Sequence, residues 1–162
     1  PKGTSFLYVK KEHQPWVRPL IYSWGKDGDD PGPSEFLQDF QWQGTRDMAA
    51  FLTLPKVIQF FQDHIEGKRL SCKKLIQKTG TELARLFNTP PIYASADWIH
   101  QMVSHPLPVN APEDIKERLW AAYKIEIPVF QWCGQRYIRV SCNVYNTDQQ
   151  MEYFLNALRS LI

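Results

Sequence analysis

The spacing of apolar residues predicts helices in four stretches of the chain. In these stretches apolar side chains return every three or four positions, which is the period of one face of an α-helix. The apolar faces of the four predicted helices cover residues 54–65, 72–87, 115–122 and 151–161. The first helical pattern begins at Asp47, and Pro112 opens the third. Thr147 and Gln150 stand just before the last helix at the spacing of a capping box, a pattern that starts helices.

Strands are predicted where β-branched and aromatic residues gather between turn residues. These segments are 4–10, 19–23, 125–129 and 136–142, together with 101–109, whose two prolines suit only an edge strand. The second half of the chain then has the order strand, helix, strand, strand, helix. This order is typical of a compact α/β unit with a small, mainly antiparallel sheet.

The first half of the chain is less complete. It offers two predicted strands and a loop over 25–34 that is rich in Gly, Pro and Asp. Two strands rarely form a stable sheet alone, so we expect this half to borrow strands from another chain or from sequence upstream of Pro1. A first residue other than methionine agrees with a cut piece of a longer protein, or with removal of the initiator.

Composition restricts the classes of partner. Hydrophobic residues make up 43% and charged residues 22% of the chain, a mixture typical of a folded domain. The 19 Lys and Arg against 17 Asp and Glu leave a net charge of +2, so charge predicts neither a nucleic-acid nor an anionic-membrane partner. The apolar runs are too short for a membrane span, and no signal peptide is expected.

Cysteines and histidines give weak signals. Cys72, Cys133 and Cys142 form no CxxC pair and are odd in number, which favours reduced thiols and a cytoplasmic protein over a disulfide framework. The histidines lie far apart without metal-ligand spacing, so no metal site is predicted. Basic residues over 68–78 form either an anion-binding face or a solvated helix surface, and the balanced total charge favours the second.

The segment 42–47 (WQGTRD) is the first candidate for chemistry. Gly44 lets a ligand approach the backbone closely, and Thr45 adds a hydroxyl and a backbone donor just before a helix start, where phosphate binds well. Asp47 is expected to cap that helix. The same residues also suit a plain capped turn, so phosphate binding stays one of two interpretations.

The segment 139–146 (RVSCNVYN) is the second candidate. Strand alternation places Ile138, Val140 and Cys142 on the core face and Arg139 on the opposite face. The planar guanidinium of Arg139 can donate two parallel hydrogen bonds to a carboxylate. The alternative is an exposed strand arginine that binds no ligand.

Together these segments resemble motifs of class V aminotransferase-fold enzymes, in particular the isopenicillin N epimerase-like branch. These are pyridoxal-phosphate enzymes of fold type I. The matching pieces follow the expected order over nearly the whole chain. They are 1–9 (PKGTSFLYV), 19–25 (PLIYSWG), 40–47 (FQWQGTRD), 124–129 (KIEIPV) and 139–146 (RVSCNVYN).

The resemblance implies a role for individual residues. Gly44 and Thr45 would contact the phosphate of pyridoxal 5'-phosphate held by the neighbouring subunit of a homodimer. Arg139 would bind the carboxylate of an amino-acid substrate. Trp24 and Trp42 would line the pocket. None of these residues would be catalytic, and no metal is implied.

The resemblance also implies a domain organisation. Residues 1–66 would be the C-terminal remnant of the large cofactor-binding domain, and 67–90 would be a long connecting helix. Residues 91–162 would be the small C-terminal α/β domain. The Schiff-base lysine of such enzymes precedes the segment that matches 1–3, so we expect it to be absent here, and Lys2 is not its equivalent.

The functional prediction is therefore a fragment of an enzyme that acts on an amino acid, of the epimerase, aminotransferase or carbon–sulfur lyase type. The parent protein is expected to be the enzyme, and the isolated chain is expected to be inactive. Its partner would be a second copy or a missing N-terminal segment. The alternative is a non-catalytic interaction or scaffold domain that retains the fold.

Overall fold

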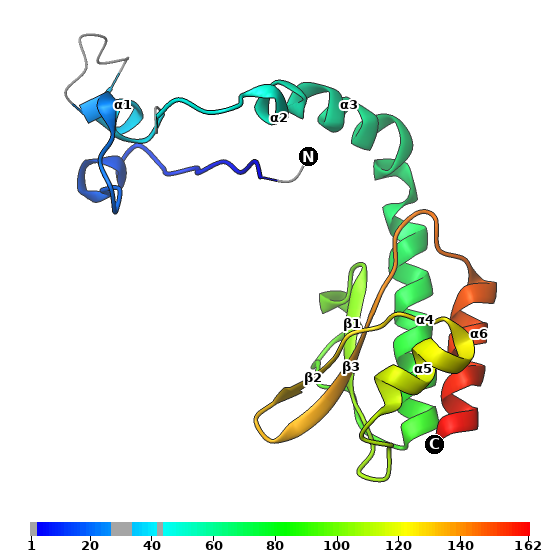
Figure 1. Cartoon of the computed structure of the whole chain (residues 1–162). Coiled ribbons are helices and arrows are strands. Elements are labelled where there is room, and N and C mark those ends of the chain that lie inside the picture. The colour runs from blue at the N-terminus through cyan, green and yellow to red at the C-terminus, as the bar shows by residue number, and fades with distance from the viewer. Residues whose placement is uncertain (1–2, 27–33, 42–43) are drawn as a thin grey trace. The chain divides into compact units, whose positions relative to one another are not determined.

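The computed structural model of the chain describes residues 3–26, 34–41 and 44–162 (Figure 1). The described chain divides into a first unit, Pro1–Gln59, and a second unit, Phe60–Ile162. Each unit is taken by itself below. The second unit contains the sheet and a hydrophobic core, whereas the first consists of short helices and extended segments.

The second unit has the order of elements that the apolar pattern predicts. It begins with the last residues of α3 (Leu54–His64) and the short turn η3 (Glu66–Lys68). The long helix α4 (Arg69–Phe87) and the short turn η4 (Ala96–Trp98) come next. The elements that follow are β1 (Met102–Pro106), α5 (Ile115–Tyr123), β2 (Val129–Trp132), β3 (Gln135–Ser141) and α6 (Asp148–Leu161). The predicted order of strand, helix, strand, strand, helix is confirmed, and the mixture of helices with one small sheet agrees with the α/β class.

The sheet is antiparallel, with β3 in the centre and the strands in the order β1-β3-β2. The prolines of the 101–109 segment accordingly fall in or after an edge strand. The predicted strand over 125–129 begins too early, because pairing in β2 starts only at Val129. Lys124 adopts a left-handed conformation with φ +56°, and the Ile125 N–H bonds to the Leu119 carbonyl, so these residues complete the end of α5 instead.

One face of the sheet forms the core with α4, α5 and α6. Figure 1 shows α4 and α6 side by side, and these two helices are in contact. The residues that lose all solvent contact come from every one of these elements: Ile76 and Leu83 of α4, Ile115 and Leu119 of α5, Ile138 of β3 and Leu158 of α6. The unit therefore has one continuous core.

Local signals in the sequence start and end the helices. At α6 the predicted capping box is present: the Thr147 hydroxyl accepts from the Gln150 N–H, and the Gln150 side chain accepts from the Thr147 N–H. Helix α4 ends at Asn88, which takes the left-handed conformation (φ 50°) that commonly terminates a helix. These local signals determine where α6 begins and where α4 ends.

Helix α4 packs closely against β1 at Gly80. A Cβ atom at this position would lie 3.2 Å from the Val103 Cγ2 and 3.3 Å from the Tyr93 hydroxyl. Glycine costs stability inside a helix because of its backbone freedom. A glycine is found here because the narrow space between α4 and β1 leaves little room for a larger side chain.

We expect the Gly80→Val variant of the full chain to lose about 1–3 kcal/mol of unfolding free energy, because the added atoms overpack this contact. Gly67→Val is the matched control, since no atom lies within 4 Å of a Cβ there. The control should lose less than about 1 kcal/mol. Urea unfolding followed by circular dichroism measures both, and equal losses would contradict the close packing.

His105 is a polar residue inside this core, with no solvent exposure. Its Nε2 lies 2.9 Å from the Thr89 hydroxyl, while its Nδ1 is buried and has no hydrogen-bond partner among the described residues. The ring packs 5.8 Å from the ring of Phe87. Burial lowers the pKa of His105 below its ordinary value of 6.5, so the folded chain holds a neutral imidazole.

The buried imidazole predicts a pH-dependent stability. Below about pH 6.5 the unfolded chain gains a proton at His105, whereas the folded chain does not until the pH reaches the lowered pKa. We therefore expect the unfolding free energy to be highest above pH 6.5 and to fall as the pH decreases toward 5. His105→Gln should reduce this fall. Urea midpoints at pH 8 and pH 5 test the expectation, and an equal fall in both proteins would refute it.

In its described residues the first unit contains helical elements and no strand. They are η1 (Gln14–Trp16), η2 (Trp24–Lys26), α1 (Glu35–Gln41), α2 (Ala49–Leu52) and α3 (Leu54–His64), which continues into the second unit. The predicted helix over 54–65 is confirmed by α3. The predicted strands over 4–10 and 19–23 are wrong: both segments are extended or turned, without strand pairing.

These two segments have strand composition but no neighbour to pair with. Most of their large side chains are exposed, and three are almost fully so: Phe6 at 90%, Leu20 at 103% and Ile21 at 85%. Within the described part of this unit only Phe36 and Asp39 are buried. A strand needs a second strand for its backbone hydrogen bonds, so composition alone does not produce one.

Helix α4 is the longest helix of the described ranges, and it is strongly polar on its outer side. None of the helices in the part of the chain that the structure describes combines the length and the apolar character needed to cross a bilayer.

Candidate functional site

Arg139 lies in the central strand β3 with its side chain on the sheet face that the helices leave open. Its neighbours Ile138 and Val140 are 0% and 5% exposed, while Arg139 is exposed. The predicted alternation is thus confirmed. Its backbone N–H bonds to the Pro128 carbonyl at 3.0 Å, which fixes the strand at this point. Within the described residues the guanidinium makes neither an ion pair nor a hydrogen bond, so its donors are available to a ligand.

A first hollow of about 710 Å³ opens beside Arg139. It lies between the 123–128 segment, the end of β3 and the start of α6, because β2 pairs with β3 only as far as Ile138. Besides Arg139, its walls carry Lys124, Glu126, Gln149 and other residues. The Lys124 ammonium bonds to the Ala121 carbonyl at 3.1 Å, which directs it toward the end of α5.

A second hollow of about 670 Å³ lies on the β1 side of the same strand. Ser104 of β1 pairs directly with Arg139, and Met102 pairs with Ser141, so these side chains share the open face of the sheet. Trp98 and Tyr145 complete its exposed walls. Ser141 and Asn146 line both hollows and form the ridge between them.

The loop between β3 and α6 is held by its asparagines. The Asn146 side-chain oxygen accepts from the Asn143 N–H at 2.9 Å, and the Asn146 N–H donates to the Asn143 carbonyl at the same distance. The Asn146 amide also donates to the Gln150 side chain at 3.3 Å. These bonds fix Tyr145 and the ridge beside Arg139.

The charges at the start of α6 are paired with α4. Lys78 donates to the Asp148 carboxylate at 2.8 Å, and this hydrogen bond and charge raise the pKa of Lys78 above its ordinary value. Lys73 lies 3.9 Å from Asp97. Two of the basic residues of the 68–78 segment therefore serve in ion pairs, which agrees with the interpretation as a solvated helix surface.

A stack of aromatic rings, which the sequence pattern does not predict, occupies the far end of the open sheet face. Tyr137 points away from the core, yet only 7% of it is exposed. The Phe130 ring stacks on it at 5.6 Å, and the Trp132 ring packs at 6.2 Å. The pairing of Phe130 with Tyr137 across β2 and β3 causes this contact. The stack covers one end of the open face, and Arg139 lies beyond it together with Ser104 and Ser141.

Gly44 and Thr45 belong to the first unit. Gly44 has φ +106°, a conformation that favours glycine, and a Cβ there would meet only the Ser23 hydroxyl at 4.0 Å. Thr45 is exposed. The Asp47 carboxylate accepts from the Ala49 N–H at 2.8 Å, but α2 begins only at Ala49 with Met48 as its N-cap residue, so the predicted cap acts one residue early. Four residues of helix give this turn little dipole.

Of the two tryptophans that are predicted to line the pocket, the structure describes one. Trp24 lies in η2 and is 83% exposed, and its chain neighbour Ser23 lies beside Gly44. Trp42 lies outside the described residues. Trp24 and Gly44 are thus brought to one part of the first unit, while Arg139 belongs to the second unit.

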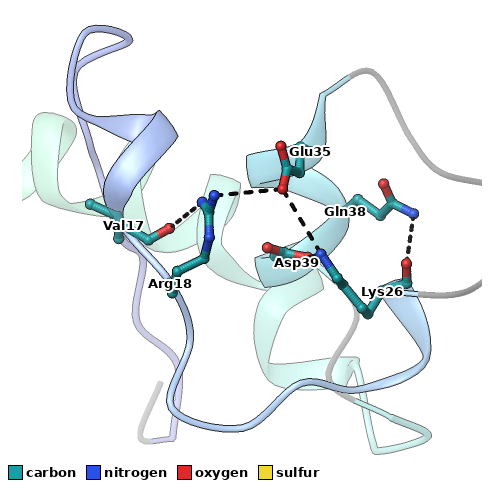
Figure 2. Close-up of polar contacts among 6 residues, drawn as sticks. All are labelled: Val17, Arg18, Lys26, Glu35, Gln38 and Asp39. Atoms are coloured by element: carbon teal, nitrogen blue, oxygen red, sulfur yellow. Dashed lines mark hydrogen bonds and ion pairs between the residues drawn. The ribbon is translucent and has the colours of Figure 1, made fainter.

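A cluster of charged residues ties η2 to α1, as Figure 2 shows. The Lys26 ammonium lies 3.8 Å from the Asp39 carboxylate and 3.9 Å from that of Glu35, which also lies 3.6 Å from Arg18. The Gln38 side chain donates to the Lys26 carbonyl at 3.2 Å. In the sequence, this cluster is indicated by Glu35 and Asp39, which stand one helical turn apart. The cluster fixes the turn that carries Trp24.

Three cysteines are present as free thiols. Cys72 and Cys142 are buried against each other in the core, and Cys133 is exposed at the turn between β2 and β3. Burial raises the pKa of the Cys142 thiol to about 11, and the adjacent Cys72 thiol adds to the shift. These buried thiols are packing groups rather than nucleophiles. In the described ranges no group of His, Cys, Asp and Glu is arranged to hold a metal ion.

Comparison with known proteins confirms the resemblance that the two motifs predict, namely to part of a class V aminotransferase-like protein. The chain is 27% identical to the isopenicillin N epimerase of Amycolatopsis lactamdurans, over 99% of this chain and 44% of that protein. It is 25% identical to the isopenicillin N epimerase of Streptomyces clavuligerus, over 99% and 44% respectively.

A third relative has a different name. The chain is 25% identical to a probable chloroplastic L-cysteine desulfhydrase of Arabidopsis thaliana, over 100% of this chain and 37% of that protein. The chain thus spans less than half of the length of the curated relatives it matches. No protein-family model matches the chain.

Proposed function

We propose that this chain is the substrate-clamping part of a pyridoxal-phosphate enzyme of fold type I that acts on an amino acid. Arg139 carries the proposal. It is an exposed guanidinium without a partner in the described residues, on a fixed strand between two hollows. The relatives' names support a reaction of the epimerase or carbon–sulfur lyase type.

In this proposal Arg139 holds the α-carboxylate of the substrate. Its fork of N–H donors matches the two oxygens, so one side chain fixes both the position and the rotation of the amino acid. The aromatic stack behind it and the bonded loop before α6 keep the strand from moving when the ligand binds. Arg139 thus orients the bond at the α-carbon that is to be broken.

The Gly44–Thr45 turn is proposed to contact the cofactor phosphate, in the site of a neighbouring subunit. The turn fits this role because Gly44 presents open backbone at a positive φ and the Thr45 hydroxyl is exposed. When bound, the cofactor supplies an electron sink for charge that develops at the α-carbon. In this proposal one chain holds the phosphate in its neighbour's site and the substrate carboxylate in its own.

The proposed organisation follows from these roles. Residues 1–66 are assigned to the large cofactor domain, 67–90 to the connecting helix that contains all of α4, and 91–162 to the small domain with the sheet. The exposed apolar residues of the first unit support this assignment, because a segment without a core of its own needs cover from other protein. A homodimer and a cytoplasmic setting belong to the same proposal.

A binding titration of the cofactor-loaded full-length enzyme tests the function. Each L-amino acid is compared with the amine that lacks only its carboxylate, and the visible absorption of the cofactor reports binding. We expect the amino acids to bind at least about tenfold more tightly than their amines, the difference that one charge-assisted pair supplies. Equal affinities would contradict the carboxylate clamp. No spectral change with any amino acid would favour the non-catalytic scaffold instead.

A further inference from the structure

The two hollows along β3 differ in chemistry; Arg139 lines the first, and its register partner Ser104 lines the second. The first contains the charged residues Lys124 and Glu126 in addition to Arg139. The second is lined by aromatic, thioether, hydroxyl, amide and imidazole groups, and none of its described lining residues is Asp, Glu, Lys or Arg. A substrate anchored on Arg139 can extend toward one or the other, and the choice decides which side chains it can carry.

The register of the sheet favours the second hollow. Ser104 stands directly opposite Arg139, so their Cβ atoms are about 5 Å apart, and Met102 is the diagonal neighbour at about 7 Å. Ser104 and Met102 are therefore the neighbours of Arg139 on this face, within reach of a ligand that Arg139 holds. Both residues share the open sheet face with Arg139, whereas the first hollow extends past the edge of the sheet toward the buried Met151 and Phe154.

Exposure gives a second reason. Trp98 is 80%, Met102 50% and Tyr145 74% exposed around this hollow. Large apolar groups gathered at one site are typical of a binding surface. Tyr145 is held there by the hydrogen bonds between Asn143 and Asn146, so this wall is formed before any ligand arrives.

We propose that Trp98, Met102 and Tyr145 determine substrate specificity by receiving the side chain of the amino acid whose carboxylate Arg139 holds, and that they select an uncharged side chain. This inference rests on the proposed function. A side-chain carboxylate or ammonium would lose its hydration in a hollow that offers no opposite charge.

The test uses two matched pairs of ligands, glutamine with glutamate and asparagine with aspartate. Their dissociation constants are measured with the cofactor-loaded full-length enzyme at pH 8 by the visible absorption of the cofactor. The wild-type enzyme should bind each uncharged member at least about tenfold more tightly than its acidic counterpart. Met102→Lys should reduce this ratio about tenfold, because it places an ammonium at the wall of the hollow.

Gln149→Lys is the matched control, since it places the same charge on the exposed rim of the first hollow. It should leave the ratio unchanged. Tyr145→Lys provides a second charge on the opposite wall if Met102→Lys does not fold. A ratio that moves with Gln149→Lys alone, or a wild-type enzyme that binds glutamate as tightly as glutamine, overturns the inference.

Arg139→Ala separates this inference from the function on which it rests. If that variant weakens all four ligands equally while Met102→Lys and Tyr145→Lys change no ratio, the carboxylate clamp stands and the specificity role falls. If Arg139→Ala leaves all four dissociation constants unchanged, the clamp falls and the specificity role falls with it.

Discussion

Replacing Leu83 with alanine is expected to lower the unfolding free energy of the chain by about 2–5 kcal/mol. Leu83 has no solvent exposure and lies in α4 at the centre of the core formed with the sheet and α6. The loss combines the transfer of the removed carbon atoms with the cavity left behind, because the neighbouring helices cannot collapse fully into the space. Folded domains are only about 5–15 kcal/mol more stable than their unfolded chains, so this is a large effect.

Leu70→Ala is the matched control for this prediction. Leu70 belongs to the same helix but is 62% exposed, so its truncation should change the unfolding free energy by less than about 0.5 kcal/mol. Urea unfolding of the full chain, followed by tryptophan fluorescence, measures both variants. Similar losses in the two would mean that α4 does not pack through the face described here.

Under the proposed function, replacing Arg139 with alanine is expected to raise the KM of the full-length protein for amino acids about 10- to 100-fold. The estimate corresponds to about 1.5–3 kcal/mol for the lost hydrogen bonds between a charged donor and a carboxylate. The unfolding free energy should change little, because Arg139 is exposed and has no partner in the described residues. The KM of Arg139→Lys should lie between those of the wild type and Arg139→Ala, since lysine keeps the charge and loses the planar fork.

The control for the Arg139 variants is Arg118→Ala. Arg118 is an exposed arginine of α5 that pairs with Asp114 at 2.8 Å and lines neither hollow. Its removal changes the net charge by the same amount and should leave KM unchanged. The result that would remove the carboxylate role from Arg139 is an unchanged KM in Arg139→Ala, measured under conditions where kcat is also determined.

The helices were predictable because their signals are local. The capping box at Thr147, the left-handed Asn88 and the buried stripe of α4 each depend on residues within a few positions of one another. Strand alternation also placed Arg139 correctly on the open face, because burial of Ile138 and Val140 leaves no other choice. These parts of the candidate site follow from period and composition alone.

The failures have a common physical cause, which is that strands depend on partners distant in sequence. The segments 4–10 and 19–23 have the composition of strands, but no neighbouring strand supplies hydrogen bonds to them in the described chain. The strand over 125–129 was placed too early because the end of α5 uses the backbone of residues 124 and 125. The stack on Tyr137 depends on the register of β2 against β3, which composition does not determine.

The three cysteines can report how often the core of the second unit opens, because two are buried and one is exposed. Cys133 lies exposed in the hairpin turn and should react at once with a thiol reagent. Cys72 and Cys142, on α4 and at the end of β3, can react only when the helix separates from the sheet. Mass spectrometry of pulse-labelled protein would therefore count one fast and two slow modifications. The slow rate gives the opening free energy of the core without any engineered probe.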